Sequence, residues 1–278
     1  MKYYDLRKKE YVIYDDDSKA LSFFYNNIFG RVLLKVLISG FVRKPYNYYM
    51  STKLSLKKVN KFIKKNNINM DEYEKENYKS FNEFFMRKIK SNRRPIANGL
   101  FAIADSKLSV YKIDNNLSFK VKNSIYTIEE LLGENCSNFD DGYALIFRLC
   151  VDDYHHYVYP DDGEILYNKR INGKLHTVQP LAFKKYKVFS ENTREITMLK
   201  TKHYGKVAYI EVGAMMIGKI VNENVTKFKR GSEKGHFEFG GSTCILLFEK
   251  DKIKINELIV ENTKKDIETI VKLGDSLE

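Results

Sequence analysis

The segment Phe239-Gly240-Gly241-Ser242-Thr243 can carry out chemistry on its own backbone. Because glycine has no Cβ, a Gly–Ser bond lets the chain bend sharply, so the Ser242 hydroxyl oxygen can approach the carbonyl of Gly241. A base must remove the hydroxyl proton, as for any serine nucleophile. A Gly-Gly pair between two strands also suits a simple hairpin turn. Taken alone, the segment favours the turn and is weak evidence for chemistry.

The common nucleotide and metal motifs are missing from the sequence. It contains no GxxxxGK[ST], no GxGxxG and no HExxH. The adjacent pair His155 and His156 makes a poor joint ligand set, because neighbouring side chains on a strand point to opposite faces. We therefore expect no metal.

Three widely spaced cysteines without a CxxC pair favour free thiols in a reducing compartment, and we expect these thiols to be buried.

The positive charge is concentrated in the N-terminal third. Of 48 basic and 36 acidic residues, 22 basic and 10 acidic ones lie in residues 1–98, which accounts for the whole net charge of +12. Between Arg31 and Lys65 there are ten basic residues and no acidic one. A basic surface of this kind suits an anionic membrane or nucleic acid. An ordinary solvated lysine-rich face remains an alternative.

Two amphipathic segments coincide with this charge. The stretch Ala20–Val42 is apolar at helical spacing, but polar and charged residues interrupt the roughly 18 uncharged residues that a spanning helix needs. It suits a helix that lies in a membrane interface, or one that packs on the protein's own core. The stretch Ser51–Lys65 predicts a second amphipathic helix, with lysines on its polar side. Ser80-Phe81-Asn82-Glu83 is a capping box that begins a further helix.

After residue 98 the periodicity changes from helices to strands. Buried strands are predicted at Tyr143–Cys150 and Val207–Val212, and two more flank the Gly-Gly pair, at Phe237–Phe239 and Cys244–Phe248. The sequence therefore predicts an α+β fold: N-terminal amphipathic helices followed by a β-rich, mostly antiparallel body. We place a basic helical, membrane-associating region at 1–98 and the catalytic body at 99–278.

The residues around Ser242 resemble the cleavage segment of phosphatidylserine decarboxylases, whose core motif is Leu-Gly-Ser-Thr or Gly-Gly-Ser-Thr. The resemblance runs from Phe237 to Phe248. Upstream segments are similar to other blocks of this family, in the same order: Ser80–Arg87 with Arg94-Pro95-Ile96, Asp152-Asp153-Tyr154-His155, Thr177–Ala182, and Glu211–Ala214 with Gly218. Together the blocks cover roughly residues 75–260.

The resemblance implies a proenzyme that cuts itself between Gly241 and Ser242. Attack by Ser242 forms an ester, and β-elimination then separates a large chain (1–241) from a small chain (242–278). The dehydroalanine left at position 242 hydrolyses to a pyruvoyl group. This carbonyl forms a Schiff base with the substrate amine and serves as the electron sink for decarboxylation, as pyridoxal phosphate does elsewhere. The covalent pyruvoyl group is thus the implied cofactor, with no metal.

The family also implies a serine-protease-like triad for the self-cleavage. Its aspartate lies in a Ser-Pro-Ala-Asp-Gly motif, and the matching segment Ala102–Ser106 keeps Ala104 and Asp105. Asp105 is therefore the expected carboxylate of the triad, although a turn or capping role is the alternative.

The histidine of the triad is harder to assign. Many family members have Asp-Tyr-His-x-x-His, but here Val158 stands at the second histidine position and cannot accept a proton. His155 matches the first histidine and is our expected base, with His156 in reserve. Only one of the two can face Ser242, because they are neighbours on a strand. The remaining histidines are two more distant candidates and one expected surface residue: His176, His236 and His203, respectively.

By resemblance, the expected function is conversion of phosphatidylserine to phosphatidylethanolamine. The expected partners are the anionic phospholipid membrane, the substrate phosphatidylserine, and the two chains of one precursor, with no nucleic acid. The expected location is peripheral, on the cytoplasmic face of the cell membrane. Two alternatives remain: a pyruvoyl-dependent decarboxylase of another amine acid, such as a soluble amino acid, and a non-cleaving family member that acts as a lipid-binding module.

Overall fold

A computed structural model describes residues 1–14, 19–74, 77–215, 219–240 and 242–278 of the chain. Two residues named above, Gly241 and Gly218, lie outside these ranges.

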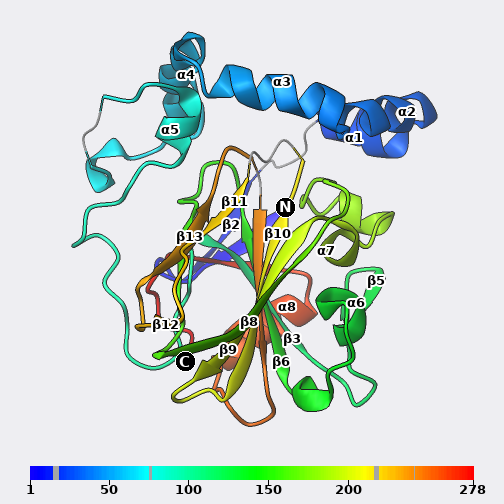
Figure 1. Ribbon diagram of the computed structural model, residues 1–278, viewed down its shortest axis with the longest axis vertical. Helices are drawn as coiled ribbons and strands as arrows, with labels where there is room; N and C mark the ends of the chain where they lie inside the picture. Colours follow the sequence, from blue (N-terminus) through cyan, green and yellow to red (C-terminus); the bar gives the residue numbers. More distant parts are fainter. Residues whose placement is uncertain (15–18, 75–76, 216–218, 241) are drawn as a thin grey trace.

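A ten-stranded sheet forms the body of the protein (Figure 1). Its neighbouring strands are antiparallel except for β1 and β15, which are parallel. In spatial order, its strands are β12 (Lys227–Phe228), β8 (Gly163–Ile171), β9 (Arg194–Thr201), β10 (Lys206–Gly213), β14 (Ser242–Phe248), β6 (Tyr143–Leu149), β3 (Ser106–Lys112), β15 (Glu268–Val271), β1 (Lys2–Asp5) and β2 (Glu10–Ile13).

Smaller elements complete the body. A three-stranded sheet has the order β11 (Ile220–Asn222), β13 (Glu233–Phe237) and β7 (His156–Val158), and a hairpin joins β4 (Ser118–Val121) to β5 (Ser124–Thr127). The helical segments of the body are α6 (Ile128–Leu132), η3 (Ser137–Phe139), η4 (Ala182–Lys184), α7 (Val188–Glu191) and α8 (Glu257–Lys264). The predicted α+β class and the mostly antiparallel body are confirmed.

The centre of the large sheet is the most buried part of the chain. All seven residues of β14 are buried, and so are most residues of its neighbours β6 and β10. Such strands are covered on both faces, which explains their almost continuous apolar sequence. The predicted strands at 143–150 and 207–212 correspond to β6 and β10. The strand predicted at 244 begins two residues earlier, at Ser242, so this serine is the first residue of a central strand.

The N-terminal helices form a separate layer at one end of the molecule (Figure 1). They are α1 (Lys19–Asn26), α2 (Ile28–Leu37), α3 (Gly40–Met50), the 3₁₀ helix η1 (Lys53–Lys58) and α4 (Val59–Lys65), followed by η2 (Met70–Glu72) and α5 (Phe81–Phe85). The single helix expected over 20–42 is divided into three. Asn27 makes the first break, because its Oδ1 accepts hydrogen bonds from the amides of Phe29 and Gly30 at 2.8 and 3.3 Å and so begins α2.

The capping box at Ser80 is half confirmed. The Ser80 hydroxyl accepts a hydrogen bond from the Glu83 amide at 3.1 Å, as predicted. The Glu83 carboxylate, however, accepts from the amide of Lys79. Both bonds still satisfy free amides at the start of α5.

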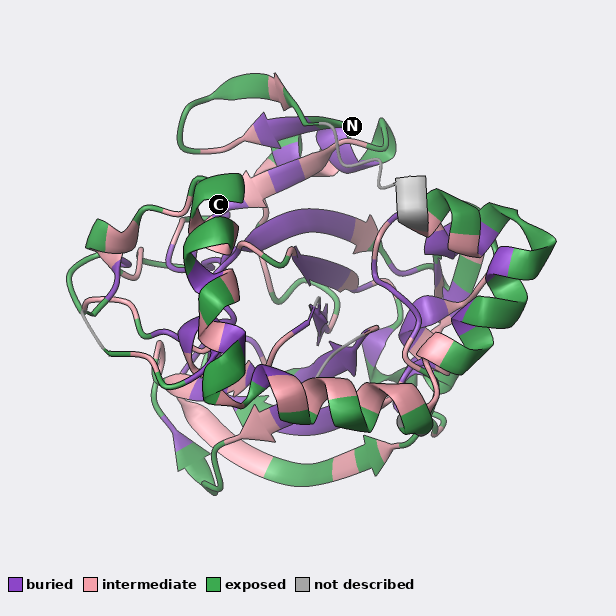
Figure 2. Cartoon of the chain, turned by 90° about the horizontal axis from the view of Figure 1, so that it is seen from above, coloured by how far each residue is buried: buried purple, intermediate pink, exposed green. Residues whose placement is uncertain are grey.

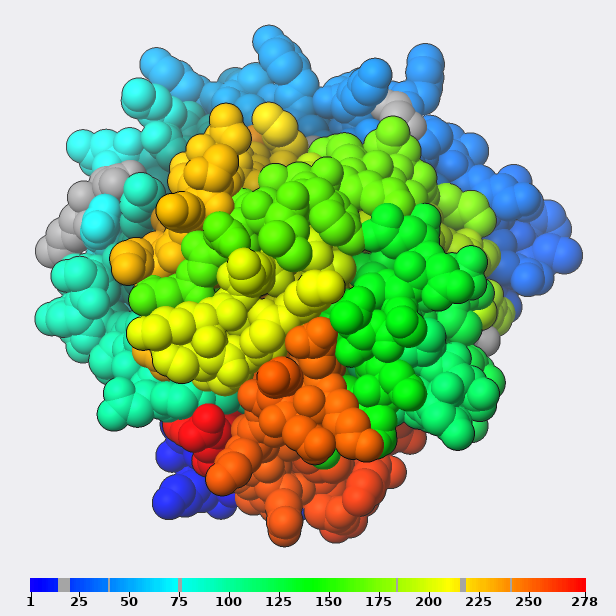
Figure 3. Space-filling model, turned by 60° about the horizontal axis from the view of Figure 1, so that its bottom comes forward, coloured from blue at the N-terminus to red at the C-terminus, as the bar shows by residue number. Residues whose placement is uncertain are grey.

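The first residues of the chain belong to the sheet and not to the helical layer. Strand β1 pairs with β15 near the C-terminus, and β2 pairs with β1. Figure 3 shows these N-terminal residues (dark blue) beside the C-terminal ones (red), on the side opposite to the helices. The predicted boundary at residue 98 therefore does not separate helices from strands completely. The three cysteines are free, but only Cys244 is buried, whereas Cys136 and Cys150 are partly exposed.

Candidate active site

Ser242 is the first residue of β14 and lies between the last residues of two neighbouring strands. Its register partners are Leu149 at the end of β6 and Gly213 at the end of β10. The residue is fully buried, and its hydroxyl oxygen has no hydrogen-bond partner among the described residues. Gly240, two residues earlier, has a φ of 140°, a conformation that favours glycine over residues with a side chain. A buried hydroxyl without a partner is costly in an ordinary core, and a catalytic role is one recognised reason for it.

His155 lies close to the same end of the sheet. It follows the turn that leaves β6, where the Asp153 amide donates to the Cys150 carbonyl at 3.0 Å. Its own carbonyl accepts a hydrogen bond from the amide of Phe237, at the end of β13, at 3.0 Å. Leu149, at the end of β6, is the register partner of Ser242. Phe237 precedes Ser242 by five residues in the chain. His155 is therefore connected to the neighbourhood of Ser242 on both sides.

The His155 ring has the protonation pattern of a base. Its Nδ1–H donates to the backbone carbonyl of Asp153 at 2.9 Å, whereas its Nε2 is buried without a partner among the described residues. Burial lowers the pKa of His155 to about 3, and the bond to Asp153 opposes this effect only partly. The imidazole is therefore neutral at physiological pH, and a lone pair on Nε2 is available to accept a proton.

Three aromatic contacts fix the position of this ring and of the segment before Ser242. The Phe85 ring of α5 lies 4.2 Å from the His155 ring and 5.3 Å from the ring of Phe239, measured between centroids. The ring of Phe239 also meets that of Phe81 at 5.1 Å. The helix that begins at Ser80 thus positions both the candidate base and the residues leading to the cleavage bond.

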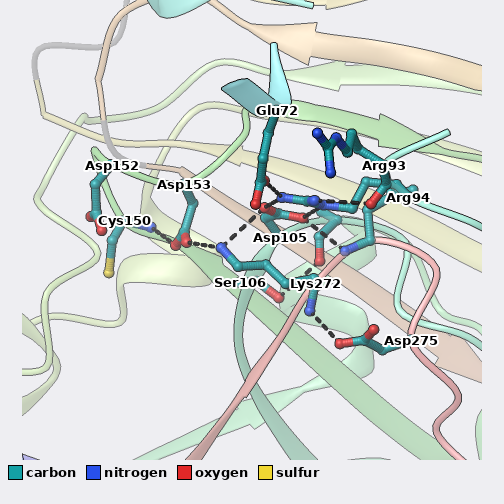
Figure 4. Close-up of polar contacts among 12 residues, drawn as sticks. Glu72, Arg93, Arg94, Asp105, Ser106, Cys150, Asp152, Asp153, Lys272 and Asp275 are labelled. Atoms are coloured by element: carbon teal, nitrogen blue, oxygen red, sulfur yellow. Dashed lines mark hydrogen bonds and ion pairs between the residues drawn. The ribbon is translucent and has the colours of Figure 1, made fainter. Parts of the chain in front are cut away.

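Asp105 lies in a buried cluster of charges (Figure 4). Its carboxylate accepts two hydrogen bonds from Arg94, at 3.0 and 2.8 Å, and one from the amide of Leu273 at 2.8 Å. The Lys272 ammonium lies 3.1 Å from the same carboxylate, and Arg94 also pairs with Glu72 at 2.9 Å. Burial by itself raises the pKa of Asp105, but Lys272 and Arg94 outweigh it and hold the pKa well below its usual range.

The structure does not bring Asp105 to His155 in the way that a serine-protease triad would. Within the described residues, His155 Nδ1 is bound by the carbonyl of Asp153 and not by a carboxylate. The connection to Asp105 is indirect: Lys272 lies 3.1 Å from Asp105 and 3.7 Å from the Asp153 carboxylate. Lys107 holds the other side of Asp153 at 2.8 Å. Among the described residues, Lys272 and the Asp153 segment connect Asp105 to the base.

His156 points away from His155, as neighbouring strand residues should. Its Nδ1 lies 2.8 Å from the Glu233 carboxylate, its Nε2 lies 3.0 Å from the carbonyl of Met86, and its ring stacks on that of His236 at 5.0 Å. Potential metal-ligand atoms of His156, Glu233 and His236 lie within 4.8 Å of one another. These are the donors through which the protein could hold a cation, although sequence spacing gave no sign of them.

His176 has a different environment. Its ring stacks on Tyr186 at 4.0 Å, and both ring nitrogens are buried without partners among the described residues. The side-chain Nδ2 of Asn192 donates to the carbonyls of His176 and Gly213, at 2.8 and 2.7 Å. Since Gly213 is the register partner of Ser242, His176 lies near the same end of β10 and is a second candidate base.

Two further positions singled out in the sequence are His203, expected at the surface, and Val158, which replaces the second histidine of the family motif. His203 is exposed and pairs with Asp161 at 2.9 Å, as expected for a surface residue. Val158 is buried in β7, where its amide donates to the carbonyl of Ile103 at 3.1 Å.

Sequence reasoning missed Lys272 and the role of Arg94 as the partner of Asp105. Arg94 was part of a family-like block, which could have marked it, but its partner could not be named. Lys272 stands in an undistinguished C-terminal segment, so no motif drew attention to it.

Fold and site together define the class of protein: an α+β protein with a buried serine at the start of a central strand and a neutral histidine near it, a combination suited to nucleophile and base. Comparison with known proteins gives the family. The family model described as phosphatidylserine decarboxylase matches residues 81–277.

Curated relatives agree with this match. The chain is 49% identical over 263 residues to phosphatidylserine decarboxylase proenzyme 2 of Clostridium acetobutylicum, covering 92% of this chain and 90% of that protein. It is 40% identical over 268 residues to the phosphatidylserine decarboxylase proenzyme of Fusobacterium nucleatum (92% and 89% covered), and 38% identical over 292 residues to that of Clostridium tetani (100% and 97% covered). The chain belongs to the phosphatidylserine decarboxylase family, a family of carboxy-lyases.

Proposed function

We propose that this protein decarboxylates phosphatidylserine to phosphatidylethanolamine with a pyruvoyl group that it makes from Ser242. One observation carries the proposal: the Ser242 hydroxyl is buried, has no partner among the described residues, and follows the glycine pair of the family's cleavage motif. Relatives that cover nearly the whole chain are named proenzymes, which supports self-cleavage.

His155 is the proposed base for this self-cleavage. Its Nε2 takes the proton of the Ser242 hydroxyl, and the oxygen attacks the carbonyl carbon of Gly241. The C–N bond breaks as the proton passes to the Ser242 nitrogen, which leaves an ester. Loss of the Ser242 Cα proton then breaks the Cβ–O bond and releases residues 1–241 with a C-terminal carboxylate. The dehydroalanine tautomerises to an imine, and water displaces ammonia to leave the pyruvoyl carbonyl.

The surroundings of residue 242 fit such a group. The site is buried and close to a neutral imidazole, so the small ketone would not be exposed to bulk water. When present, the pyruvoyl carbonyl supplies the electron sink for loss of carbon dioxide. The described residues hold its neighbourhood rigid, since β14 is paired on both sides over its whole length.

A membrane partner is supported by the helical layer. Large apolar side chains are exposed on α1, α2, α3 and η1: Phe23, Ile28, Phe29, Val32, Leu33, Val36, Phe41, Tyr48 and Leu54. Figure 2 shows how much of these helices is exposed. No helix among the described residues is both long and apolar enough to cross a bilayer. An apolar face beside uncompensated lysines is typical of interfacial binding to anionic lipid. We therefore propose a peripheral position on the cytoplasmic face of the cell membrane.

The same layer argues for a lipid and against a soluble amine acid as substrate. A soluble substrate requires no apolar face, and exposed patches of this size usually have a partner. The non-cleaving alternative predicts instead that the chain stays whole.

Intact mass of freshly purified protein tests the proposed maturation. We expect two chains, residues 1–241 and a 37-residue chain 242–278 whose N-terminus resists Edman degradation because a pyruvoyl group has no amine. Ser242→Ala should remain one chain of 278 residues, and purified wild type should release carbon dioxide from phosphatidylserine. A wild-type preparation that stays whole, or one that cleaves without acting on phosphatidylserine, would contradict the proposal.

A further inference from the structure

An aromatic groove lies between the helical layer and the segment before Ser242. Its apolar wall is formed by Tyr46 and Met50 of α3, Phe62 of α4, Phe81 of α5, and Phe239. The rings interlock: Phe62 and Phe81 meet at 5.1 Å, Phe81 and Phe239 at 5.1 Å, and Tyr46 and Phe239 at 6.2 Å. The groove has a volume of about 310 Å³, within the range of small-molecule sites.

Three lysines form the polar side of this groove: Lys58, Lys61 and Lys65. None of them pairs with a carboxylate in the part of the chain that the structure describes, whereas many lysines of the body do. The Lys58 ammonium instead lies over the rings of Tyr49 and Tyr46, at 4.8 and 5.4 Å. Three uncompensated ammonium groups beside an apolar wall favour a ligand that is both anionic and apolar.

Side-chain packing connects the wall of the groove to the candidate active site. Phe239 is three residues before Ser242, and its amide donates to Asn82 Oδ1 at 2.9 Å, which fixes it against α5. Its ring packs on that of Phe85, and the ring of Phe85 packs on that of His155. A ligand on the aromatic wall therefore contacts Phe239, which leads to Ser242 along the chain and packs on the ring that holds His155.

We propose that this groove binds one phospholipid molecule, with its phosphodiester against Lys58, Lys61 and Lys65 and the first part of an acyl chain on the aromatic wall. The inference rests on the proposed function and names the residues that hold its substrate. A phospholipid has the required chemistry, because a negative phosphodiester is joined to apolar chains. Lysine binds such a group as a point charge, without demanding a fixed geometry.

Calorimetric titration of mature wild-type protein with monomeric dihexanoylphosphatidylglycerol tests the groove directly. This short lipid has the phosphodiester and the chains but no amine to react, and below its micelle concentration it forms no membrane surface. We expect the combined Lys58→Ala, Lys61→Ala, Lys65→Ala variant to bind it at least about tenfold more weakly, because it removes the three positive charges on the polar side of the groove.

The matched control replaces Lys53, Lys57 and Lys64 by alanine. These lysines lie on the same two helical segments, η1 and α4, but they do not line the groove. Their replacement removes the same amount of charge as the groove variant does. The control should bind the lipid within about twofold of wild type. Self-cleavage and thermal melting show whether each variant is folded. Should the first variant fail to fold, Lys61→Gln and Lys65→Gln, both at exposed positions, provide the same comparison.

A second experiment measures the rate of carbon dioxide release as a function of the concentration of monomeric dihexanoylphosphatidylserine. The groove variant should raise KM at least about tenfold with kcat little changed, as expected for loss of uniform binding. The proposed groove would be refuted if the two triple variants had the same lipid affinity and the same KM, or if wild type did not bind the phosphatidylglycerol. Either result would refute it even if phosphatidylserine is decarboxylated. Lysine-dependent binding without any carbon dioxide release would support the groove and refute the proposed function.

Discussion

The cluster around Asp105 and the N-terminal helical layer differ in whether their charged side chains are paired. In the cluster, three carboxylates pair with three cations: Asp105, Asp153, Arg94 and Lys107 are buried, and Glu72 and Lys272 at its edge are partly exposed. In the helical layer, ten basic residues between Arg31 and Lys65 have no acidic residue among them, and large apolar side chains are exposed.

The difference shows which region has its charges and apolar side chains satisfied within the protein and which one presents them to a partner. Buried charges are tolerated only when they are paired, so the cluster is part of the folded body and its removal should unfold the protein. Exposed apolar side chains and unpaired lysines contribute little to folding, and they suit a surface that binds something else. Predictions about the body therefore concern chemistry and stability, and those about the helical layer concern binding.

The largest effect is expected at His155. His155→Gln should slow self-cleavage by a factor of about 10² or more and accumulate the uncut chain, because glutamine cannot take the Ser242 proton. Chain separation over time on a denaturing gel measures this rate. The neighbouring variant His156→Gln should cleave nearly normally, since its ring is directed to Glu233 and Met86. If His156→Gln blocks cleavage and His155→Gln does not, the base is wrongly assigned. If neither matters, His176 is the next candidate, then His236.

Asp105→Asn should destabilise the body by about 3–5 kcal/mol, because it leaves the buried Arg94 and the partly buried Lys272 beside a neutral group. The free energy of unfolding is measured by urea titration in a Ser242→Ala background, where every molecule is one chain. The control Asp141→Asn removes an exposed carboxylate that pairs with Lys112 and Lys250, and it should change the unfolding free energy much less than Asp105→Asn does, because exposed ion pairs contribute little.

This pair of variants also predicts a pH dependence. Although burial raises the pKa of Asp105, Lys272 and Arg94 lower it below the value in the unfolded chain. The stabilisation is therefore fully present above the unfolded pKa of about 3.9 and is lost as the pH falls below it. Wild type should lose stability on acidification more steeply than Asp105→Asn. Parallel curves would show that Asp105 titrates as it does in the unfolded chain.

Substitutions in the helical layer should weaken membrane binding and leave the stability of the fold nearly unchanged. Phe29→Ser with Val32→Ser replaces side chains that are 78% and 63% exposed. The unfolding free energy should change by no more than about 0.5 kcal/mol per site. Sedimentation with vesicles that contain anionic lipid should weaken at least about tenfold, since burial of such a side chain contributes about 1.5–3 kcal/mol.

Two controls separate the apolar and electrostatic parts of this binding. Ile125→Ser, at an exposed position of β5 in the body, should leave vesicle binding unchanged. High salt should release part of the wild-type protein, because exposed charges are screened beyond about 10 Å at 0.1 M. Binding that ignores both lipid charge and salt would refute the electrostatic contribution.

The smallest effect is expected from metal removal. His156, Glu233 and His236 could hold a cation, but the proposed chemistry uses a ketone and an imidazole and requires none. Self-cleavage and carbon dioxide release should therefore be unchanged by EDTA. Activity that is lost with EDTA, restored by Zn²⁺ and absent in His236→Ala would instead assign this trio a role in the reaction.

Local pattern was enough to predict much of this protein. The alternation and apolar runs predicted β6, β10 and β14, the capping signal predicted the start of α5, and the ordered motifs identified the family. These features depend on residues that are neighbours in the chain, where spacing reflects a single helix or strand. The candidate nucleophile, Ser242, and the candidate base, His155, came from the same motifs.

The partners of those residues were decided only by the tertiary structure. Asp105 is bound by the amide of Leu273, 168 residues away, and by Lys272, so its distance from His155 could not follow from the motif that contains it. Likewise, β1 joins the sheet beside β15, and His156 meets Glu233 through the pairing of β7 with β13. Strand pairing and buried ion pairs join segments that are remote in sequence, and local periodicity carries no information about which remote segment will be the partner.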